Sequence, residues 1–151
     1  MKQNPKEQAL RDNLEPGKLA KDGFLGEDKR PVDEIIADDL GELNAMGVTQ
    51  QQLAARMREL TKAGLEGLGA PIDFGGYTLV VEEFMGWMGC PFRDYRRAAK
   101  RITHATAAKG GKTMTWTDMS IHLIEHHGFF QGLGSTYRLE PVELVEFLKL
   151  V

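Results

Sequence analysis

The stretch TQQQLAARMRELTKAGLEGLGAPIDFGGYTLVVEE, residues 49–83, decides the fold class because its hydrophobic period changes partway along. Its first part carries Leu53, Met57 and Leu60 at helical spacing, which predicts a helix with one apolar face. From Tyr77 onward, apolar and polar residues alternate and β-branched side chains are frequent, which predicts a strand of about eight residues. Helices followed by strands in this order indicate an α+β fold rather than a series of βαβ units.

The predicted helix in this stretch carries signals at both of its ends. Thr49 is a natural N-cap, and Gln52 three residues later completes a capping box. Gly64 can adopt the left-handed conformation that ends many helices, so we expect the helix to stop there.

Further helices and short strands are predicted on both sides of this stretch. Gly75-Gly76 is expected to turn a hairpin between residues 72–74 and the strand that follows. Gly86 and Gly89 interrupt the strand pattern, and residues 95–106 fit either a helix or a strand. The remaining predicted elements are strands at residues 113–116 and 137–139, and helices at 31–45, 117–127 and from Pro141 to the end of the chain.

We therefore expect one α+β domain over residues 32–151, with four or five helices packed on a small antiparallel sheet. Residues 1–31 are polar and broken by proline and glycine, so they are expected to form an N-terminal arm with one short helix. The apolar pair Phe24-Leu25 is expected to dock this arm on the body of the domain.

The composition excludes several classes of protein. A chain of 151 residues, 42% hydrophobic and 27% charged, fits one globular domain. The single cysteine, Cys90, excludes an internal disulfide and a cluster of cysteine metal ligands. No uncharged stretch reaches the roughly 18–20 apolar residues that span a bilayer, and residues 1–18 lack the apolar core of a secretory signal. We expect a soluble, cytoplasmic protein without a membrane partner.

The net charge of −3 conceals a strong asymmetry along the chain. Residues 93–112 carry seven basic residues and one acidic residue, Asp94, for a net charge of +6, so the other 131 residues carry −9. An acidic block runs from Glu27 to Glu42. Charge runs are most often solvated surfaces. The alternatives are an anionic partner for the basic block, or acidic and basic blocks that meet between copies of the chain in a homo-oligomer.

The predicted helix TDMSIHLIEHH, residues 117–127, carries the candidate metal site. His122 and His126 are four residues apart, so their rings project from adjacent turns and can ligate one divalent transition metal ion. Asp118 and Glu125 lie on the same side of this helix and can add a carboxylate ligand or orient an imidazole.

Two observations limit the interpretation of this helix. Leu123 rather than glutamate follows the first histidine, which departs from the HExxH motif of zinc proteases. A solvated helix face, or histidines with purely structural hydrogen bonds, would produce the same pattern. His127 falls on the apolar side and is expected to face the core.

Two neighbouring segments add candidate groups. Cys90 is expected to be a small buried hydrophobe, with a lowered-pKa nucleophile or a third metal ligand as the alternatives. The glycine-rich loop after the histidine helix contains Ser135, Thr136 and Arg138, which can bind a carboxylate or a phosphate. A tight structural connection is the alternative for this loop. Residues 111–113 lack the first glycine of a P-loop, and no dinucleotide-binding fingerprint is present.

Residues 33–84 resemble a winged helix-turn-helix, with MGVTQQQLAARMRELTKAGLE similar to a recognition helix and IDFGGYTLVVEE in the place of the wing. The resemblance covers about a third of the chain. It implies DNA binding, with the basic block adding phosphate contacts. The acidic helix before it and a wing without Lys or Arg at its tip depart from the family pattern. The residues that would contact nucleic acid are Thr49, Gln50, Gln51, Arg56, Arg58, Arg96, Arg97, Lys100 and Arg101.

The leading hypothesis from the sequence is a small binding protein that holds a metal ion or a small anion at the histidine helix. The alternatives are a winged-helix-like DNA-binding protein and an enzyme that uses Cys90. The sequence leaves open whether the protein is an enzyme.

Overall fold

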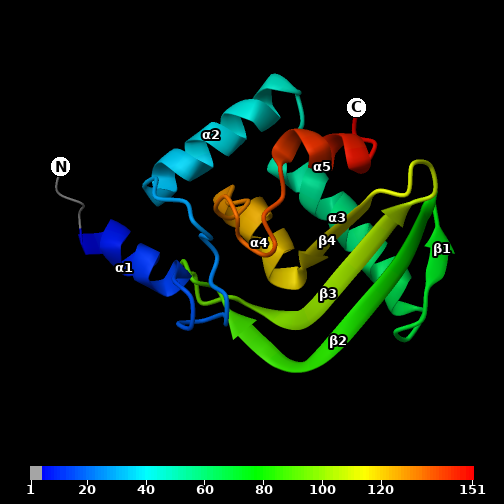
Figure 1. Ribbon diagram of the computed structural model, residues 1–151, viewed down its shortest axis with the longest axis horizontal. Coiled ribbons are helices and arrows are strands. Elements are labelled where there is room, and N and C mark those ends of the chain that lie inside the picture. The colour runs from blue at the N-terminus through cyan, green and yellow to red at the C-terminus, as the bar shows by residue number, and fades with distance from the viewer. Residues whose placement is uncertain (1–4) are drawn as a thin grey trace.

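The structure, a computed structural model, describes residues 5–151 and consists there of five helices and one four-stranded sheet (Figure 1). The elements are α1 (Pro5–Leu14), α2 (Val32–Ala45), α3 (Gln50–Leu65), β1 (Ile72–Phe74), β2 (Tyr77–Gly89), β3 (Arg97–Ala107), β4 (Thr113–Thr117), α4 (Asp118–His127) and α5 (Pro141–Phe147). The strands pair antiparallel in the order β1-β2-β3-β4. This confirms the predicted α+β fold; residues 1–4 of the predicted N-terminal arm lie outside the described residues.

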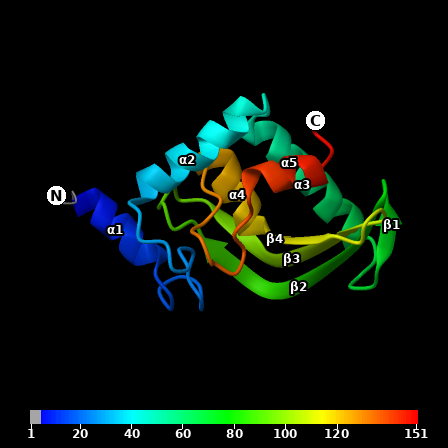
Figure 2. The same cartoon turned by 45° about the horizontal axis from the view of Figure 1, so that its top comes forward.

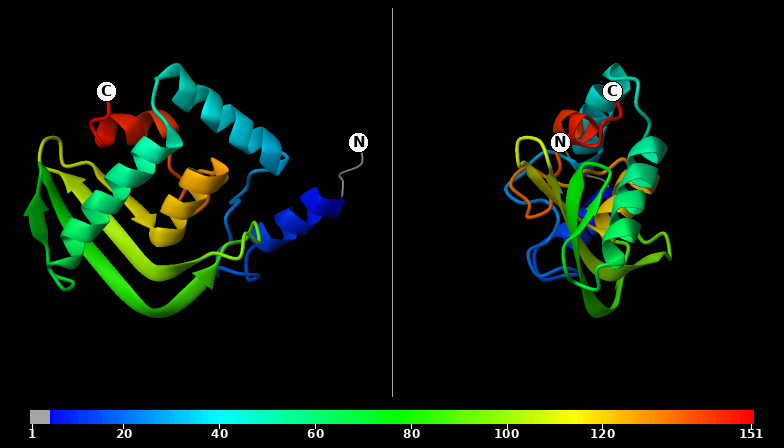
Figure 3. Two further views of the ribbon diagram at one scale, coloured as in Figure 1. Left: turned by 180° about the vertical axis from the view of Figure 1, so that it is seen from behind. Right: turned by 90° about the vertical axis from the view of Figure 1, so that its right-hand side faces the viewer.

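β2 and β3 form a long hairpin that bends sharply midway. Their pairing is regular from Tyr77 to Glu83 and resumes at Trp87, so a bulge lies between these two positions. Gly86 in this bulge has a φ of +98°, a conformation that side-chain-bearing residues adopt only with strain. Figures 1 and 3 show the hairpin folded into a V, with α3 and α4 on its concave side. The bend carries the outer end of the hairpin toward the N-terminal helix.

The structure corrects two strand predictions and decides a third that the sequence leaves open. β2 continues to Gly89 and has 13 residues, because Gly86 bends the strand instead of ending it. The ambiguous segment around residues 95–106 is the strand β3. The strand predicted at residues 137–139 is wrong, since the backbone there turns and the Arg138 N–H donates to the carbonyl of Ser135.

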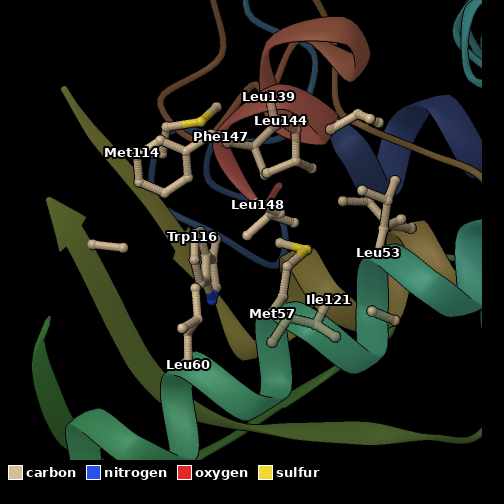
Figure 4. Packing of buried hydrophobic residues seen from close by; sticks show 14 of the residues in the cluster. Leu53, Met57, Leu60, Met114, Trp116, Ile121, Leu139, Leu144, Phe147 and Leu148 are labelled. Carbon is tan, nitrogen blue, oxygen red and sulfur yellow. The ribbon is translucent and has the colours of Figure 1, made fainter. Parts of the chain in front are cut away.

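Helices α2 to α5 form a layer over one side of the sheet, and α1 lies at the outer end of the β2–β3 hairpin (Figure 1). α3 contacts β2 and α4 contacts β3, while α2 and α5 lie side by side farther from the strands (Figure 2). Trp116 is fully buried against α3 (Figure 4). Its indole N–H donates to Thr61 Oγ1 at 3.0 Å. Of the helices within residues 5–151, none is long and apolar enough to span a bilayer.

A second apolar cluster, separate from the core around Trp116, joins the N-terminal segment to α4. Phe24 and Leu25 are buried in it together with Leu14, Leu123 and Phe129. The amide of Asn13 donates to the carbonyl of Pro91 at 3.1 Å, at the outer end of the hairpin. The predicted docking of Phe24-Leu25 is confirmed, and the contact brings the β2–β3 loop under α4.

Gly64 has a different role from the one predicted. α3 continues through it to Leu65, and its backbone lies directly against β2. A Cβ atom added at Gly64 would lie 2.6 Å from Val81 Cγ2 and 3.2 Å from Leu79 Cβ. The glycine therefore permits a close helix–sheet approach and does not end the helix.

We expect Gly64→Ala to lower the free energy of unfolding by about 1–3 kcal/mol, because the stiff β-branched Val81 cannot move aside. Alanine is the better helix former, so a helix-propensity effect alone would raise stability by about 1 kcal/mol. Gly41→Ala in α2 is the matched control, since a Cβ there meets nothing within 4 Å. Urea unfolding of both variants measures the difference, and a Gly64→Ala protein as stable as Gly41→Ala would contradict the close approach.

Candidate metal centre

Two elements that meet beneath the second apolar cluster build the candidate site. The first is α4, which begins at a capping box between Thr117 and Ser120 and ends at Gly128 in the left-handed conformation. These signals confirm the helix bounds predicted from the sequence. Because both ends are fixed, the histidines at positions 122 and 127 have defined directions.

The second element is the loop between β2 and β3, residues 90–96. The Cys90 N–H donates to the Arg96 carbonyl at 2.9 Å, which closes the loop. Arg93 and Tyr95 have φ values of +58° and +64°, on either side of Asp94. Each such conformation costs on the order of 1–2 kcal/mol for a side-chain-bearing residue. This strained backbone turns the Asp94 carboxylate back toward α4.

Four potential ligand atoms converge where the loop faces the helix. Asp94 Oδ2 lies 2.7 Å from His122 Nε2 and 2.8 Å from His127 Nε2. Cys90 Sγ lies 3.6 Å from the same His127 nitrogen. All four atoms are within 4.8 Å of one another. We call Cys90, Asp94, His122 and His127 the Cys-Asp-His cluster.

Cys90 is buried, and the other three side chains of the cluster are 12–21% exposed. Phe92 stacks on the His127 ring with centroids 4.1 Å apart and an interplanar angle of 8°. Phe129 packs edge-on against Phe92. The aromatic rings therefore fix the His127 plane, so that its Nε2 points into the cluster.

The pKa values follow from burial and from the central carboxylate. Burial acts to raise the pKa of Asp94, but hydrogen bonds from the Arg96 N–H, His127 and His122 outweigh it and hold that pKa well below its usual range. Burial lowers the pKa of His122 despite the neighbouring carboxylate. Burial, together with the negative charge of Asp94, raises the pKa of the Cys90 thiol to about 11. Near neutral pH the cluster thus holds a carboxylate, a neutral His122 and a protonated thiol.

The geometry does not fit a Cys-His-Asp relay. In a relay the histidine uses one ring nitrogen toward the nucleophile and the other toward the carboxylate. Here His127 presents the same Nε2 to both Cys90 and Asp94. Convergence of several ligand atoms on one point is the arrangement that a metal ion requires.

No protein-family model, no curated protein and no solved structure matches this chain. The residues of the site therefore carry the functional argument alone.

Of the four metal ligands predicted on the histidine helix, the structure brings His122 into the cluster. Glu125 instead accepts two hydrogen bonds from the guanidinium of Arg58. His126 lies 2.9 Å from an Arg96 nitrogen and 3.1 Å from Glu125. Asp118 Oδ2 pairs with Arg101 at 2.7 Å. The helix face that carries these groups meets arginines from α3, from the loop 90–96 and from β3.

Asp94 and the role of His127 in the cluster are not predicted from the sequence. His127 is expected against the core, yet the structure places only one ring face on Phe92 and turns its Nε2 to Asp94. One signal for Asp94 is present in the sequence: it is the only acidic residue in the basic block 93–112. An isolated carboxylate of this kind indicates a specific partner.

The candidate anion-binding loop has internal partners. The Arg138 guanidinium is 9% exposed and pairs with Asp39 and Glu140. Ser135 Oγ donates to the Gln131 side chain at 2.6 Å, and Thr136 is exposed. The ion pairs of Arg138 fasten this loop to α2, which favours the structural interpretation.

Several of the residues that would contact DNA in a winged helix are also engaged within the chain. Thr49 caps α3 by accepting from the Gln52 N–H, and Gln50 donates to the Ile124 carbonyl at 2.9 Å. Arg56 pairs with Glu59, while Gln51 is exposed. DNA binding through a winged helix stays a prediction.

Cys90 tests the enzyme alternative directly. With its pKa raised to about 11, we expect iodoacetamide to label native metal-free protein at pH 7 far more slowly than the urea-unfolded chain, with a rate that increases up to about pH 11. Mass spectrometry of timed samples measures the rate. Rapid labelling of the native thiol at pH 7 would instead support a nucleophilic cysteine.

Stability should respond to pH through His122. Because its folded-state pKa lies below the usual value of about 6.5, its neutral form is favoured by folding, and the free energy of unfolding should decrease as pH falls from about 6.5 toward 5. The lowered pKa of Asp94 acts only below about pH 4 and does not contribute in this window. Urea unfolding of metal-free wild type and His122→Gln measures the effect. An equal pH dependence in the two proteins would contradict it.

Proposed function

We propose that the protein binds a divalent transition metal ion of the zinc type through Cys90, Asp94, His122 and His127. The observation that supports this is the convergence of four ligand atoms from two different elements within 4.8 Å. The sequence predicts a divalent transition metal at this helix, and the proposal keeps His122 while exchanging the other ligands.

The chemistry of the donor set favours zinc. One thiolate, two imidazoles and one carboxylate are ligands that Zn²⁺ accepts, with bond lengths of about 2.0–2.3 Å and tetrahedral geometry. Neighbouring donor atoms in such a site are about 3.4 Å apart. The two imidazole–Asp94 distances are 2.7 and 2.8 Å and the four ligand atoms lie within 4.8 Å of one another, so Asp94 would shift outward and the more distant ligands inward around the ion.

The chain's own groups would adjust in a definite way. Cys90 would lose its thiol proton on metal binding, since the thiolate is the ligand form. The two histidines would exchange their contacts with Asp94 for metal bonds through Nε2. One thiolate and one carboxylate would balance the charge of a divalent ion, which suits a largely buried site.

Four protein ligands complete a tetrahedral shell, as in structural zinc sites rather than catalytic ones with an open position. The ion would join the strained loop 90–96 to α4. The proposed role is therefore a metal that holds the outer end of the β2–β3 hairpin in place. A homo-oligomeric state and a cytoplasmic location also stay predictions; light scattering of the purified protein measures the first.

Adjacent histidines supply the matched pair of variants that tests the metal proposal. We expect His127→Gln to abolish stoichiometric zinc binding, whereas His126→Gln should retain it, because His126 contacts Arg96 and Glu125 outside the cluster. Elemental analysis and titration of untagged protein measure the stoichiometry. Cobalt substitution adds a direct readout, since a thiolate–cobalt absorption band should vanish in Cys90→Ser.

Thermal unfolding provides the independent measurement. Zinc at a hundredfold excess over its Kd should stabilise wild type by about 2.7 kcal/mol, which corresponds to roughly 5–11 °C for a chain of this size. The same zinc should leave the melting temperature of His127→Gln unchanged. Loss of binding in His126→Gln with retention in His127→Gln would overturn the proposed ligand set in favour of the one predicted from the sequence.

A further inference from the structure

A basic groove of about 520 Å³ lies beside the Cys-Asp-His cluster, with His122 in its wall. α3, α4 and the outer half of the β2–β3 hairpin form its sides. Its charged and aromatic lining consists of Arg58, Lys62, Arg97, Arg101, Asp118 and Trp87. Four cations against one carboxylate make this groove a local concentration of positive charge.

Strand register explains how the groove presents an aromatic ring between two arginines. Trp87 pairs directly with Ala99 across the hairpin. Arg97 and Arg101 stand two residues to either side of Ala99, so all three side chains share one face of β3. The small Ala99 side chain leaves the indole uncovered, and Trp87 is 58% exposed. The Arg97 guanidinium carbon lies 5.0 Å from the Trp87 ring centroid.

Two of the four cations are available to an external anion. Arg58 is paired with Glu125, and Arg101 with Asp118. Within residues 5–151, Lys62 and Arg97 form no ion pair with a carboxylate. Both are exposed at the groove, so it combines unbalanced positive charge with an open aromatic surface.

We propose that this groove binds nucleoside phosphates, either as free nucleotides or as units of a single-stranded nucleic acid. An exposed aromatic ring beside cations is the combination that holds unpaired nucleotides, because a base stacks on the ring while its phosphate meets the charge. A base stacked on Trp87 brings its phosphate beside Arg97, and Lys62 on α3 can hold the next phosphate. A duplex hides the faces of its bases and cannot use Trp87 in this way.

Binding in the groove requires no metal ion, and the surface differs from that of the winged-helix prediction. It retains Arg58, Arg97 and Arg101 from the predicted nucleic-acid contacts. Thr49 and Gln50 at the start of α3 are left out, because they are engaged within the chain. The side of α3 that faces the hairpin takes their place.

Tryptophan fluorescence of the full chain tests the groove, because Trp116 is fully buried and Trp87 is exposed. The probes are a short oligothymidylate, adenosine monophosphate, inorganic phosphate and a DNA duplex. We expect the oligothymidylate to quench Trp87, with log K falling against log salt by about 0.7 for each phosphate bound. Contacts from Lys62 and Arg97 would give a slope of about −1.4.

Variants that remove one positive charge distinguish binding in the groove from general electrostatic attraction to the basic block. Lys62→Gln and Arg97→Gln should each weaken oligothymidylate binding about tenfold and reduce the salt slope by about 0.7. Lys109→Gln is the matched control, since it removes the same charge from the basic block at the turn between β3 and β4. All titrations use protein treated with a metal chelator, so the outcome of the metal proposal leaves this result unaffected.

The probes also identify the form of the ligand. Much tighter binding of oligothymidylate than of adenosine monophosphate assigns a single-stranded nucleic acid, and equal affinities assign a free nucleotide. Three results would overturn the proposal: no quenching by any nucleotide at low salt, preference for the duplex, or an equal loss of binding in Lys109→Gln and Arg97→Gln.

Discussion

Gly86 adopts a backbone conformation at the bulge of the β2–β3 hairpin that the rest of the structure relies on. A straight hairpin of this length would extend away from the helices, and its outer half would be a two-stranded ribbon with little to pack against. The bend instead brings Pro91 to Asn13 and the Cys90 side chain into the second apolar cluster. The same bend directs Asp94 at α4 and places Trp87 and Arg97 beside α3. Both proposed sites therefore depend on one glycine in the middle of a strand.

The loop at the end of this hairpin stores strain that the Asp94 contacts offset. Two residues in left-handed conformations cost about 2–4 kcal/mol together. Two hydrogen bonds from imidazoles to a carboxylate, at roughly 1.5–3 kcal/mol each, compensate for this cost. The balance explains why the single acidic residue of the basic block lies at the centre of the cluster. It also means that a change at Asp94 would release the loop and disturb both sites together.

The sequence predicts the fold wherever local chemistry decides it. The capping box at Thr49, the Gly75-Gly76 turn and the bounds of the helix at residues 117–127 all depend on residues close together in the sequence, and the structure confirms each of them. The sequence does not predict the role of glycines that serve contacts between distant elements. Gly64 lets α3 lie directly against Val81 of β2, and Gly86 lets the β2–β3 hairpin bend toward the helices. In both cases the glycine brings together segments that are distant in the sequence.

The candidate site shows the same difference between local signals and contacts made through the tertiary structure. His122 could be found because helical periodicity is local, but helical periodicity also selected His126, Glu125 and Asp118. Those three side chains meet Arg96, Arg58 and Arg101, whose positions depend on how α3 and β3 pack around α4. His127 lies at the last residue of α4, where the rotation of the ring depends on Phe92 from another element. A single sequence offers no signal for such a contact between loop and helix.

His122 connects the two proposals physically, because its ring belongs to the Cys-Asp-His cluster and also lines the basic groove. A difference in charge or position at this residue would couple the two sites. Zinc would draw the His122 Nε2 away from Asp94 and would add two positive charges while releasing the Cys90 proton. The net gain of one positive charge would make the potential at this end of the groove more positive, which favours an anionic ligand. Linkage requires the converse, so a bound phosphate would also raise the affinity for the metal by the same factor. The bend at Gly86 would then place a metal and an anion where each stabilises the other.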